Sequence, residues 1–95
     1  MTEIATTHRS DLSRYEAHVD GELAGFAHYD RDGDTVVFNH TEVDEQFAGR
    51  GVATRLAGDA LADVRAQGLR VRPVCAFFAT YLARHPEAQD LVEEE

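Results

Sequence analysis

Apolar and polar residues alternate through the first half of the chain, and this pattern predicts three antiparallel strands. The expected strands run over 14–19, 22–29 and 34–43. Asp20-Gly21 and the segment 30–33 carry turn residues and separate them. Gly25, inside the second strand, indicates a bulge or a close backbone approach. Residues 1–12 show no clear period and are expected to form a loose lead-in.

Strict alternation would divide the side chains of the third strand between two faces. One face would carry Val36, Phe38, His40 and Glu42, and the other would carry Val37, Asn39, Thr41 and Val43. Both faces become more polar toward the carboxyl end of the strand. This change indicates either a strand that leaves the core to form a site or one that emerges at the surface.

A helical period and a further strand follow in the second half of the chain. Apolar residues recur at helical spacing from 51 to 67, and Gly68 is a natural C-terminal stop. The segment 69–74 is expected to be a fourth strand, followed by a helix from Cys75 or Ala76 to near His85, before Pro86. A βαβ unit makes strands three and four parallel. The pattern predicts one α+β domain over 1–95, with a mixed four-stranded sheet and two main helices.

Charge and composition exclude several classes of function. The net charge is −9 and all nine basic residues are arginine, so no basic face for nucleic acid is expected. No run approaches the roughly 20 apolar residues that span a membrane, and the N-terminus lacks the apolar centre of a secretory signal. A single cysteine permits no internal disulfide. We therefore expect a cytoplasmic protein without nucleic-acid or membrane partners, whose residues 93–95 form a solvated acidic tail.

The segment Gln46-Phe47-Ala48-Gly49-Arg50-Gly51-Val52-Ala53 lies between the third strand and the first helix. Glycines at such a corner let backbone N–H groups approach a phosphate, and the helix N-terminus adds its dipole. The chain contains no lysine, so this is not the Gly-Lys-Ser/Thr loop of nucleotide hydrolases. It also follows a parallel strand, and ligands of such sheets collect at the carboxyl ends of the strands. The loop predicts a ligand that carries a phosphate or pyrophosphate.

Four segments in order resemble a short, single-domain family of the GNAT superfamily, the GCN5-related N-acetyltransferases. They are His40-Thr41-Glu42-Val43, Gln46-x-x-Gly49-x-Gly51-x-Ala53, Arg72-Pro73-Val74-Cys75 and Tyr81-Leu82-x-x-His85-Pro86-Glu87. The resemblance covers roughly residues 14–92 and implies a small GNAT-like fold. It implies that acetyl-CoA lies between strands three and four, with its pantetheine arm on backbone groups near Val43. The pyrophosphate would then lie on the loop formed by Gln46, Phe47, Ala48, Gly49, Arg50, Gly51, Val52 and Ala53.

The resemblance also implies transfer of the acetyl group to an amine acceptor, which the sequence does not identify. Glu42, at the strand end, is expected to be the general base. His40, one pleat away, is expected either to share this proton transfer or to be a structural histidine. Tyr81 resembles the tyrosine that acts as general acid in many GNAT enzymes, the alternative being core packing. Cys75 is expected beside the thioester, either as a neighbouring thiol or as the site of a transient acyl adduct.

Three functions are open from the sequence. The first is an N-acyltransferase that works by direct attack of the amine on acetyl-CoA. The second is an acyl-CoA-binding or interaction module with an incomplete acceptor pocket, and the third is a structural domain without the ligand. Either a monomer or a homodimer is expected. The spacing of His8, His18 and His28 matches no common ligand motif, so no metal is expected.

Overall fold

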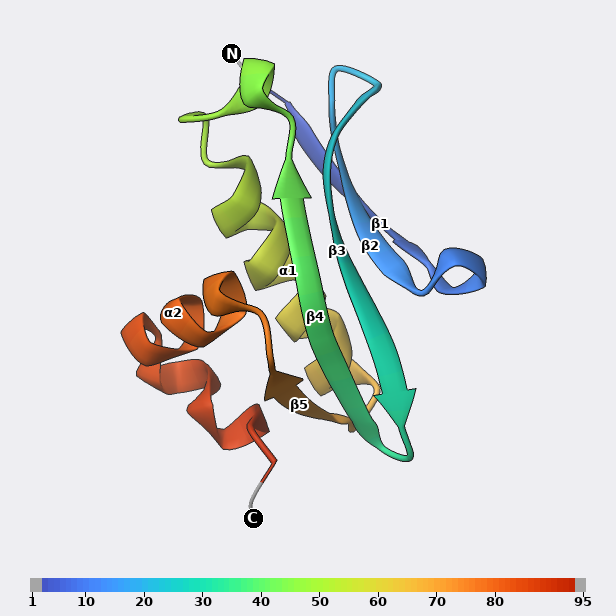
Figure 1. Cartoon of the computed structure of the whole chain (residues 1–95), viewed down its shortest axis with the longest axis vertical. Coiled ribbons are helices and arrows are strands. Elements are labelled where there is room, and N and C mark those ends of the chain that lie inside the picture. The colour runs from blue at the N-terminus through green and yellow to red at the C-terminus, as the bar shows by residue number, and fades with distance from the viewer. Residues whose placement is uncertain (1–2, 94–95) are drawn as a thin grey trace.

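The computed structural model describes residues 3–93, which form one mixed sheet with both α-helices on one side (Figure 1). The strands are β1 (Ile4–Arg9), β2 (Arg14–Val19), β3 (Glu22–Asp32), β4 (Thr35–Val43) and β5 (Arg70–Pro73). The helices are α1 (Val52–Ala66) and α2 (Ala76–Arg84), with 3-10 helices η1 (Ser10–Leu12), η2 (Glu45–Phe47) and η3 (Pro86–Leu91). The order is β1-β2-β3-β4-β5, antiparallel except for the parallel β4–β5 pair. The predicted α+β class and βαβ crossover are confirmed.

The sheet has five strands, not the predicted four, because residues 4–9 form the edge strand β1. β1 pairs with β2 along its whole length. The Thr6 hydroxyl donates a hydrogen bond to Asp59 Oδ2 of α1 at 2.8 Å, and the His8 ring stacks on Tyr15 with centroids 4.2 Å apart. Polar contacts and an aromatic stack hold this strand, so it has only a weak apolar period. The prediction of a loose lead-in is therefore wrong for residues 4–12, while residues 1–2 lie outside the described part of the chain.

The ends of the other predicted elements differ from those in the structure by three residues or fewer. β2 has the predicted bounds, and α1, β5 and α2 are shorter by one residue at their ends. β3 differs most: it continues to Asp32, because its last three residues pair with the start of β4. The turn predicted over 30–33 is reduced to Gly33 and Asp34, with a φ of +60° at Gly33.

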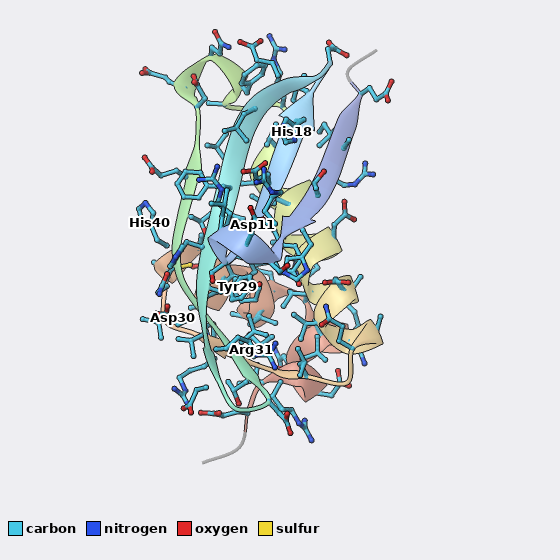
Figure 2. All side chains as sticks on the ribbon, turned by 90° about the vertical axis from the view of Figure 1, so that its right-hand side faces the viewer. Asp11, His18, Tyr29, Asp30, Arg31 and His40 are labelled. Atoms are coloured by element: carbon cyan, nitrogen blue, oxygen red, sulfur yellow. The ribbon has the colours of Figure 1, made fainter. Side chains whose placement is uncertain are left out.

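The core lies between the sheet and the two α-helices. The Phe38 ring of β4 stacks on Phe78 of α2, with centroids 4.0 Å apart. Other fully buried side chains that fill this layer are Leu56, Val52, Val64 and Val71. Neither α-helix lies on the opposite face of the sheet, which is called the helix-free face in this sense (Figures 1 and 2). Within residues 3–93, only the short 3-10 helix η1, with Asp11, stands in front of that face, at the connection between β1 and β2 (Figure 2). Over the same range, no helix is long and apolar enough to cross a bilayer.

A β-bulge at Asn39 divides β4 into two stretches. Tyr29 of β3 lies opposite Phe38, whereas its neighbour His28 lies opposite His40, so Asn39 is the extra residue. Paired residues share a face, and successive residues of β3 alternate between faces. Phe38 and His40 therefore point to opposite sides of the sheet, and Figure 2 shows His40 on the side away from the helices.

The bulge corrects the faces predicted for the third strand. Val36 and Phe38 point to the helices, but His40 and Glu42 point to the helix-free side, so these four residues do not share a face. Thr41 and Val43, opposite Ala27 and Gly25, point to the helix side instead. The two candidate proton-transfer groups consequently stand on the open side of the sheet.

The C-terminal segment closes the β5 edge of the sheet. Val92 forms a parallel bridge with Val71, and the Glu93 N–H donates to the Val71 carbonyl at 2.9 Å. The Glu93 carboxylate accepts hydrogen bonds from the Thr35 hydroxyl at 2.8 Å and from Arg72 Nε at 2.6 Å. These bonds, the one from Thr35 first, lower the pKa of Glu93. The solvated tail is therefore wrong for Glu93, and residues 94–95 lie outside the described part.

Candidate active site

The first half of the loop after β4 is held by local contacts. The Asp44 side chain accepts a hydrogen bond from the Gln46 N–H at 3.0 Å and caps η2. The Phe47 side chain is buried and anchors the loop in the core. Gly49 and Gly51 have φ values of +80° and +78°, which favour glycine. The first turn of the 15-residue helix α1 follows directly, so unpaired backbone N–H groups stand beside a glycine turn.

A groove of about 330 Å³ runs along this loop. It is lined by Val43, Phe47, Ala48, Gly49, Gly51, Val52, Ala53 and Thr54. All of them except Thr54 are residues that the sequence predicts for cofactor binding. A Cβ built on Gly49 or Gly51 would meet no atom within 4 Å, so the space over the loop backbone is open. This arrangement fits a pyrophosphate that approaches the backbone N–H groups at the start of α1.

Two predicted cofactor residues do not line the groove. The Gln46 side chain donates to Glu22 Oε1 of β3 at 3.3 Å and so ties the loop to the sheet. The Arg50 guanidinium lies over the Phe47 ring, with its carbon 5.7 Å from the ring centroid. Arg50 lies on the same loop as Gly49 and Gly51, and its contact with phosphate stays a prediction.

β4 and β5 separate before β4 ends. Their pairing runs from Thr35 to Phe38, and the Phe38 carbonyl accepts the N–H groups of Val74 at 3.0 Å and Cys75 at 2.9 Å. Figure 1 shows the chain turning from β5 into α2, away from the upper part of β4. The Asp44 N–H donates to the Ala24 carbonyl of β3, and successive N–H groups of a strand point to opposite edges. The Val43 N–H therefore points into the gap that β5 leaves.

Cys75 lies at the point of separation. It is the N-cap residue of α2 and is partly buried. Its Sγ lies 3.4 Å from the Thr41 hydroxyl, which the bulge has turned to the helix side. The thiol therefore lies between the end of β5 and the unpaired part of β4, and its place beside a thioester stays a prediction.

Glu42 and His40 form a pair on the helix-free face. His40 Nε2 lies 3.2 Å from Glu42 Oε2, and their side chains are 58% and 63% exposed. Beside Glu42 is a cavity of about 200 Å³ lined by Leu23, Ala24, Gly25, Phe26, Glu42, Val43 and Asp44. Val43 also lines the groove of the glycine loop. One residue of β4 therefore forms a wall of both hollows.

Tyr81 lies apart from this pair. Its ring stacks on His85 with centroids 3.8 Å apart, and a Cβ on Gly58 of α1 would lie 3.2 Å from its hydroxyl. Burial raises the pKa of Tyr81, with smaller contributions from Glu87 and Asp59, so the phenol keeps its proton at neutral pH. It lines a separate cavity between α1 and η3. The structure therefore does not bring Tyr81 and Glu42 together.

Comparison with known proteins decides the family. A sequence model of the GCN5-related N-acetyl-transferase family matches residues 14–91. The chain belongs to this family. Among solved structures, it resembles the NMR solution structure of a GCN5-like protein from Staphylococcus aureus, with a TM-score of 0.70 and 19% sequence identity. That match covers 98% of this chain and 89% of the other, and it shows the shared fold. A search of the curated proteins found no significant match.

The glycine loop and the gap between β4 and β5 are therefore features of a member of an acetyltransferase family. The predicted GNAT-like fold is confirmed by the family match and by the structural match. The match begins at Arg14, so β1 and η1 lie before the matched range. The roles of individual residues are not tested by these comparisons and stay predictions.

Sequence reasoning did not identify Leu23, Phe26 and Asp44 as residues near the site. Leu23 lies opposite His18, and Phe26 lies opposite Glu16. His18 and Glu16 are two positions apart in β2 and share a face. Leu23 and Phe26, three positions apart, therefore share a face only because Ala24 is an extra residue in β3. Gly25 was the available signal, since a glycine inside a strand indicates such a bulge.

Proposed function

We propose that the protein binds acetyl-CoA and transfers its acetyl group to an amine by direct attack. The observation that carries this proposal is the shared wall at Val43, which joins the glycine-loop groove to the hollow beside Glu42. A cosubstrate in the groove and an acceptor beside Glu42 would meet at the end of β4. Membership of an acetyltransferase family supports the same reaction class.

The residues of the groove would hold the cosubstrate through backbone groups. The N–H groups after Gly49 and Gly51, with the start of α1, would bind the pyrophosphate. The Val43 N–H, pointing into the gap beside β4, would bind the pantetheine arm. Bound acetyl-CoA supplies the thioester, whose C–S bond breaks as the C–N bond to the acceptor forms, giving an N-acetylated amine and CoA.

Glu42 would remove the proton that an ammonium must lose before its nitrogen can attack. Its carboxylate is exposed and can pass that proton to water, and His40, 3.2 Å away, can share it. Tyr81 is the candidate acid for the departing thiolate, because its raised pKa keeps its proton in place. Cys75, beside Thr41, would line the approach to the acyl group without bonding to it.

A second candidate function is an acyl-CoA-binding module without turnover. One observation favours it: Glu42 stands on the open face of the sheet, while Tyr81 lies over Gly58 on the helix side. The separation leaves base and acid without a common hollow among the described residues. Such a module would bind acetyl-CoA with the native loop but release no CoA in the presence of amines.

Three kinds of measurement test the proposal. Isothermal titration with acetyl-CoA should show saturable binding, and its absence would reject both candidate functions. Release of free CoA with a panel of amines should then show turnover that Glu42→Gln lowers by about 100-fold or more, as expected for loss of a general base. Tyr81→Phe should lower the rate of CoA release if Tyr81 is the general acid, and should leave it unchanged if Tyr81 only packs in the core. Mass spectrometry after incubation with acetyl-CoA should show no adduct on Cys75. Binding without turnover for every amine would leave the non-catalytic module.

A further inference from the structure

The cavity beside Glu42 points to the nature of the acceptor. We propose that it is the acceptor subsite and that it selects a primary alkylamine, a single cation on a short apolar chain. This inference rests on the proposed function, because it names the acceptor of the same transfer. It follows from three properties of the cavity: its position, its apolar floor and its charge.

The position of the cavity places an acceptor on the helix-free side of the sheet. Leu23, Phe26 and Glu42 all point to that side, since Glu42 lies opposite Phe26 and the bulge at Ala24 brings Leu23 onto the same face. Val43 lines both this hollow and the cosubstrate groove. An acceptor can therefore enter from solvent over the open face while the groove holds the cosubstrate. Neither α-helix lies on that face (Figure 1).

The floor of the cavity is apolar. Leu23 is 42% exposed, and it borders the cavity together with Phe26. Ala24 and Gly25 between them have small side chains or none, which leaves the hollow open. An apolar chain on the ligand would gain free energy by leaving water at this surface. A strongly hydrated acceptor, such as an amino sugar, would gain nothing from the same contact.

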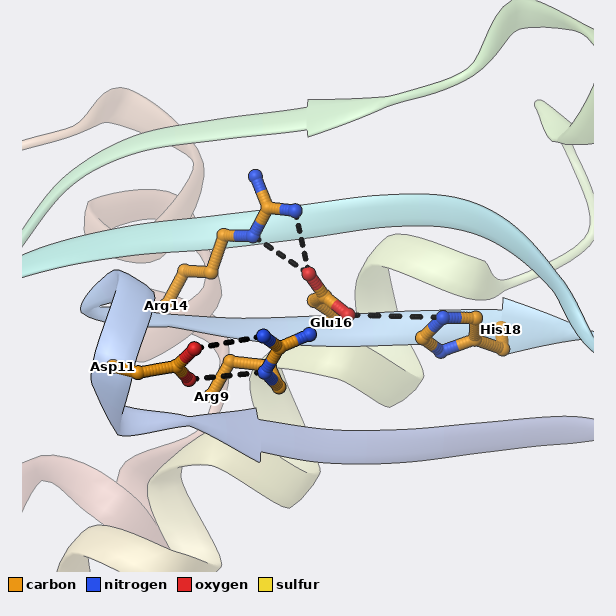
Figure 3. Close-up of polar contacts among 5 residues, drawn as sticks. All are labelled: Arg9, Asp11, Arg14, Glu16 and His18. Carbon is orange, nitrogen blue, oxygen red and sulfur yellow. Dashed lines mark hydrogen bonds and ion pairs between the residues drawn. The ribbon is translucent and has the colours of Figure 1, made fainter.

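The charge of the cavity favours a cation. The Glu42 and Asp44 carboxylates line it, and no arginine does. Two arginines on the same face are already paired with acids, as Figure 3 shows. Arg9 binds Asp11 through two hydrogen bonds of 3.0 and 2.7 Å, and Arg14 Nε donates to Glu16 at 2.7 Å. An acceptor with its own carboxylate would therefore meet the carboxylates of Glu42 and Asp44. Neither Arg9 nor Arg14 would be free to bind it.

The Arg14–Glu16 ion pair involves a buried carboxylate. Glu16 is only 4% exposed although it stands on the open face, and its carboxylate contacts both Arg14 and His18 (Figure 3). The Arg14 guanidinium also lies over the Phe26 ring, 4.8 Å from its centroid. Releasing Arg14 toward a ligand would leave a buried carboxylate without its guanidinium partner, which is costly. Arg14 is thus unavailable to an anionic acceptor.

Two matched ligands test the charge argument directly. Pentylamine and 5-aminopentanoate carry the same amine on chains of similar length, but only the second ends in a carboxylate. Isothermal titration of each into the protein saturated with CoA requires no turnover. We expect pentylamine to bind about tenfold more tightly or better, since like charges at an interface are strongly unfavourable. Asp44→Asn should narrow this difference, and asparagine retains the capping oxygen that η2 needs.

Two matched variants test the apolar floor. Leu23→Ser should raise the Kd for pentylamine, and its KM where turnover occurs, by about tenfold, as expected for losing apolar contact in a pocket. Leu12→Ser is the control, because Leu12 of η1 is exposed to 43% and does not line the cavity. Circular dichroism and acetyl-CoA titration should show both variants folded and able to bind the cosubstrate.

The outcomes separate this inference from the proposed function. Equal affinity for pentylamine and 5-aminopentanoate, or the same effect of Leu23→Ser and Leu12→Ser, would overturn the alkylamine subsite. Efficient acetylation of an amino sugar or amino acid, with alkylamines inactive, would overturn it while sparing the acetyltransferase. Failure to bind acetyl-CoA would reject the proposed function, and titration of the same two amines into the free protein would still report on the cavity. Selective binding of pentylamine that depends on Leu23 supports the inference.

Discussion

Gly25 of β3 passes so close to Glu42 of β4 that a Cβ on Gly25 would lie 2.7 Å from the Glu42 carbonyl oxygen. The same Cβ would lie 3.2 Å from the Val43 Cα. Both neighbours are backbone atoms, which cannot turn aside as a flexible side chain can. The absence of a side chain at Gly25 therefore sets where Glu42 and Val43 stand at the end of β4.

Gly25→Ala should destabilise the fold and disturb the site together. Overpacking of a well-packed region costs about 1–3 kcal/mol, and here the strands must move apart to relieve the contact. We expect the free energy of unfolding in urea to fall by that amount and acetyl-CoA affinity to weaken, since Val43 moves. Thr7→Ala, at an exposed position of β1, is the control and should change stability by less than about 0.5 kcal/mol. A Gly25→Ala protein with native stability and affinity would contradict the close approach.

Two substitutions at Gly51 should separate backbone strain from loss of the loop. Its φ of +78° suits glycine, is tolerated by asparagine and is costly for a β-branched residue. A Cβ there would meet no protein atom, so neither change creates a clash within the fold. We expect Gly51→Asn to retain most acetyl-CoA affinity and Gly51→Val to lose about tenfold or more, because the strained loop turns its N–H groups away. Isothermal titration measures both, and equal affinities would show that the loop conformation does not control binding.

The sequence predicted those parts of the fold whose periodicity reflects burial. α1 has apolar residues at helical spacing and Gly68 after it, and its predicted ends differ from the structure by one residue. β1 was not predicted, because Thr6 and His8 are held by a hydrogen bond to Asp59 and a stack on Tyr15. Such contacts depend on partners far along the chain, which a local pattern does not contain.

The candidate site was predictable to a similar extent. The residues that line the glycine-loop groove belong to a local motif, so most of them are among the residues that the sequence predicts for cofactor binding, a role that stays a prediction. The faces of His40 and Glu42 were not, because a one-residue bulge at Asn39 reverses the alternation on which face assignments depend. The same effect at Ala24 concealed Leu23 and Phe26. Strand register was therefore the missing information.

Glu93→Gln should destabilise the protein in a pH-dependent way. Hydrogen bonds from Thr35 and Arg72 lower the pKa of Glu93 in the folded protein. The ionised Glu93 carboxylate therefore stabilises the folded protein at pH values above the ordinary glutamate pKa near 4.5. This stabilisation is lost as the pH falls through the lowered pKa of Glu93 in the folded protein. Thermal unfolding should show a lower Tm for Glu93→Gln at pH 7 and a smaller difference at pH 3. Glu3→Gln, an exposed position, is the control, and a pH-independent difference would show that the carboxylate charge is not involved.

Tyr15→Phe should change the alkaline limit of stability. The Tyr15 hydroxyl donates to Asp63 Oδ2 at 2.6 Å, and burial, with Asp63 adding to it, raises the pKa of Tyr15. In the unfolded chain tyrosine loses its proton near pH 10, whereas folded Tyr15 keeps it, so stability falls as the pH rises above about 10.

Loss of this hydrogen bond should cost Tyr15→Phe about 0.5–1.5 kcal/mol at pH 8, measured by urea unfolding. At pH 11 the difference from the native protein should shrink, because phenylalanine has no proton to keep. Tyr29 and Tyr81 also have raised pKa values through burial, so the variant should flatten the alkaline decline without removing it. Tyr81→Phe, which leaves the bond to Asp63 intact, is the matched control and should follow the native decline more closely. Parallel curves for native protein and Tyr15→Phe between pH 8 and 11 would show that Tyr15 titrates normally in the fold.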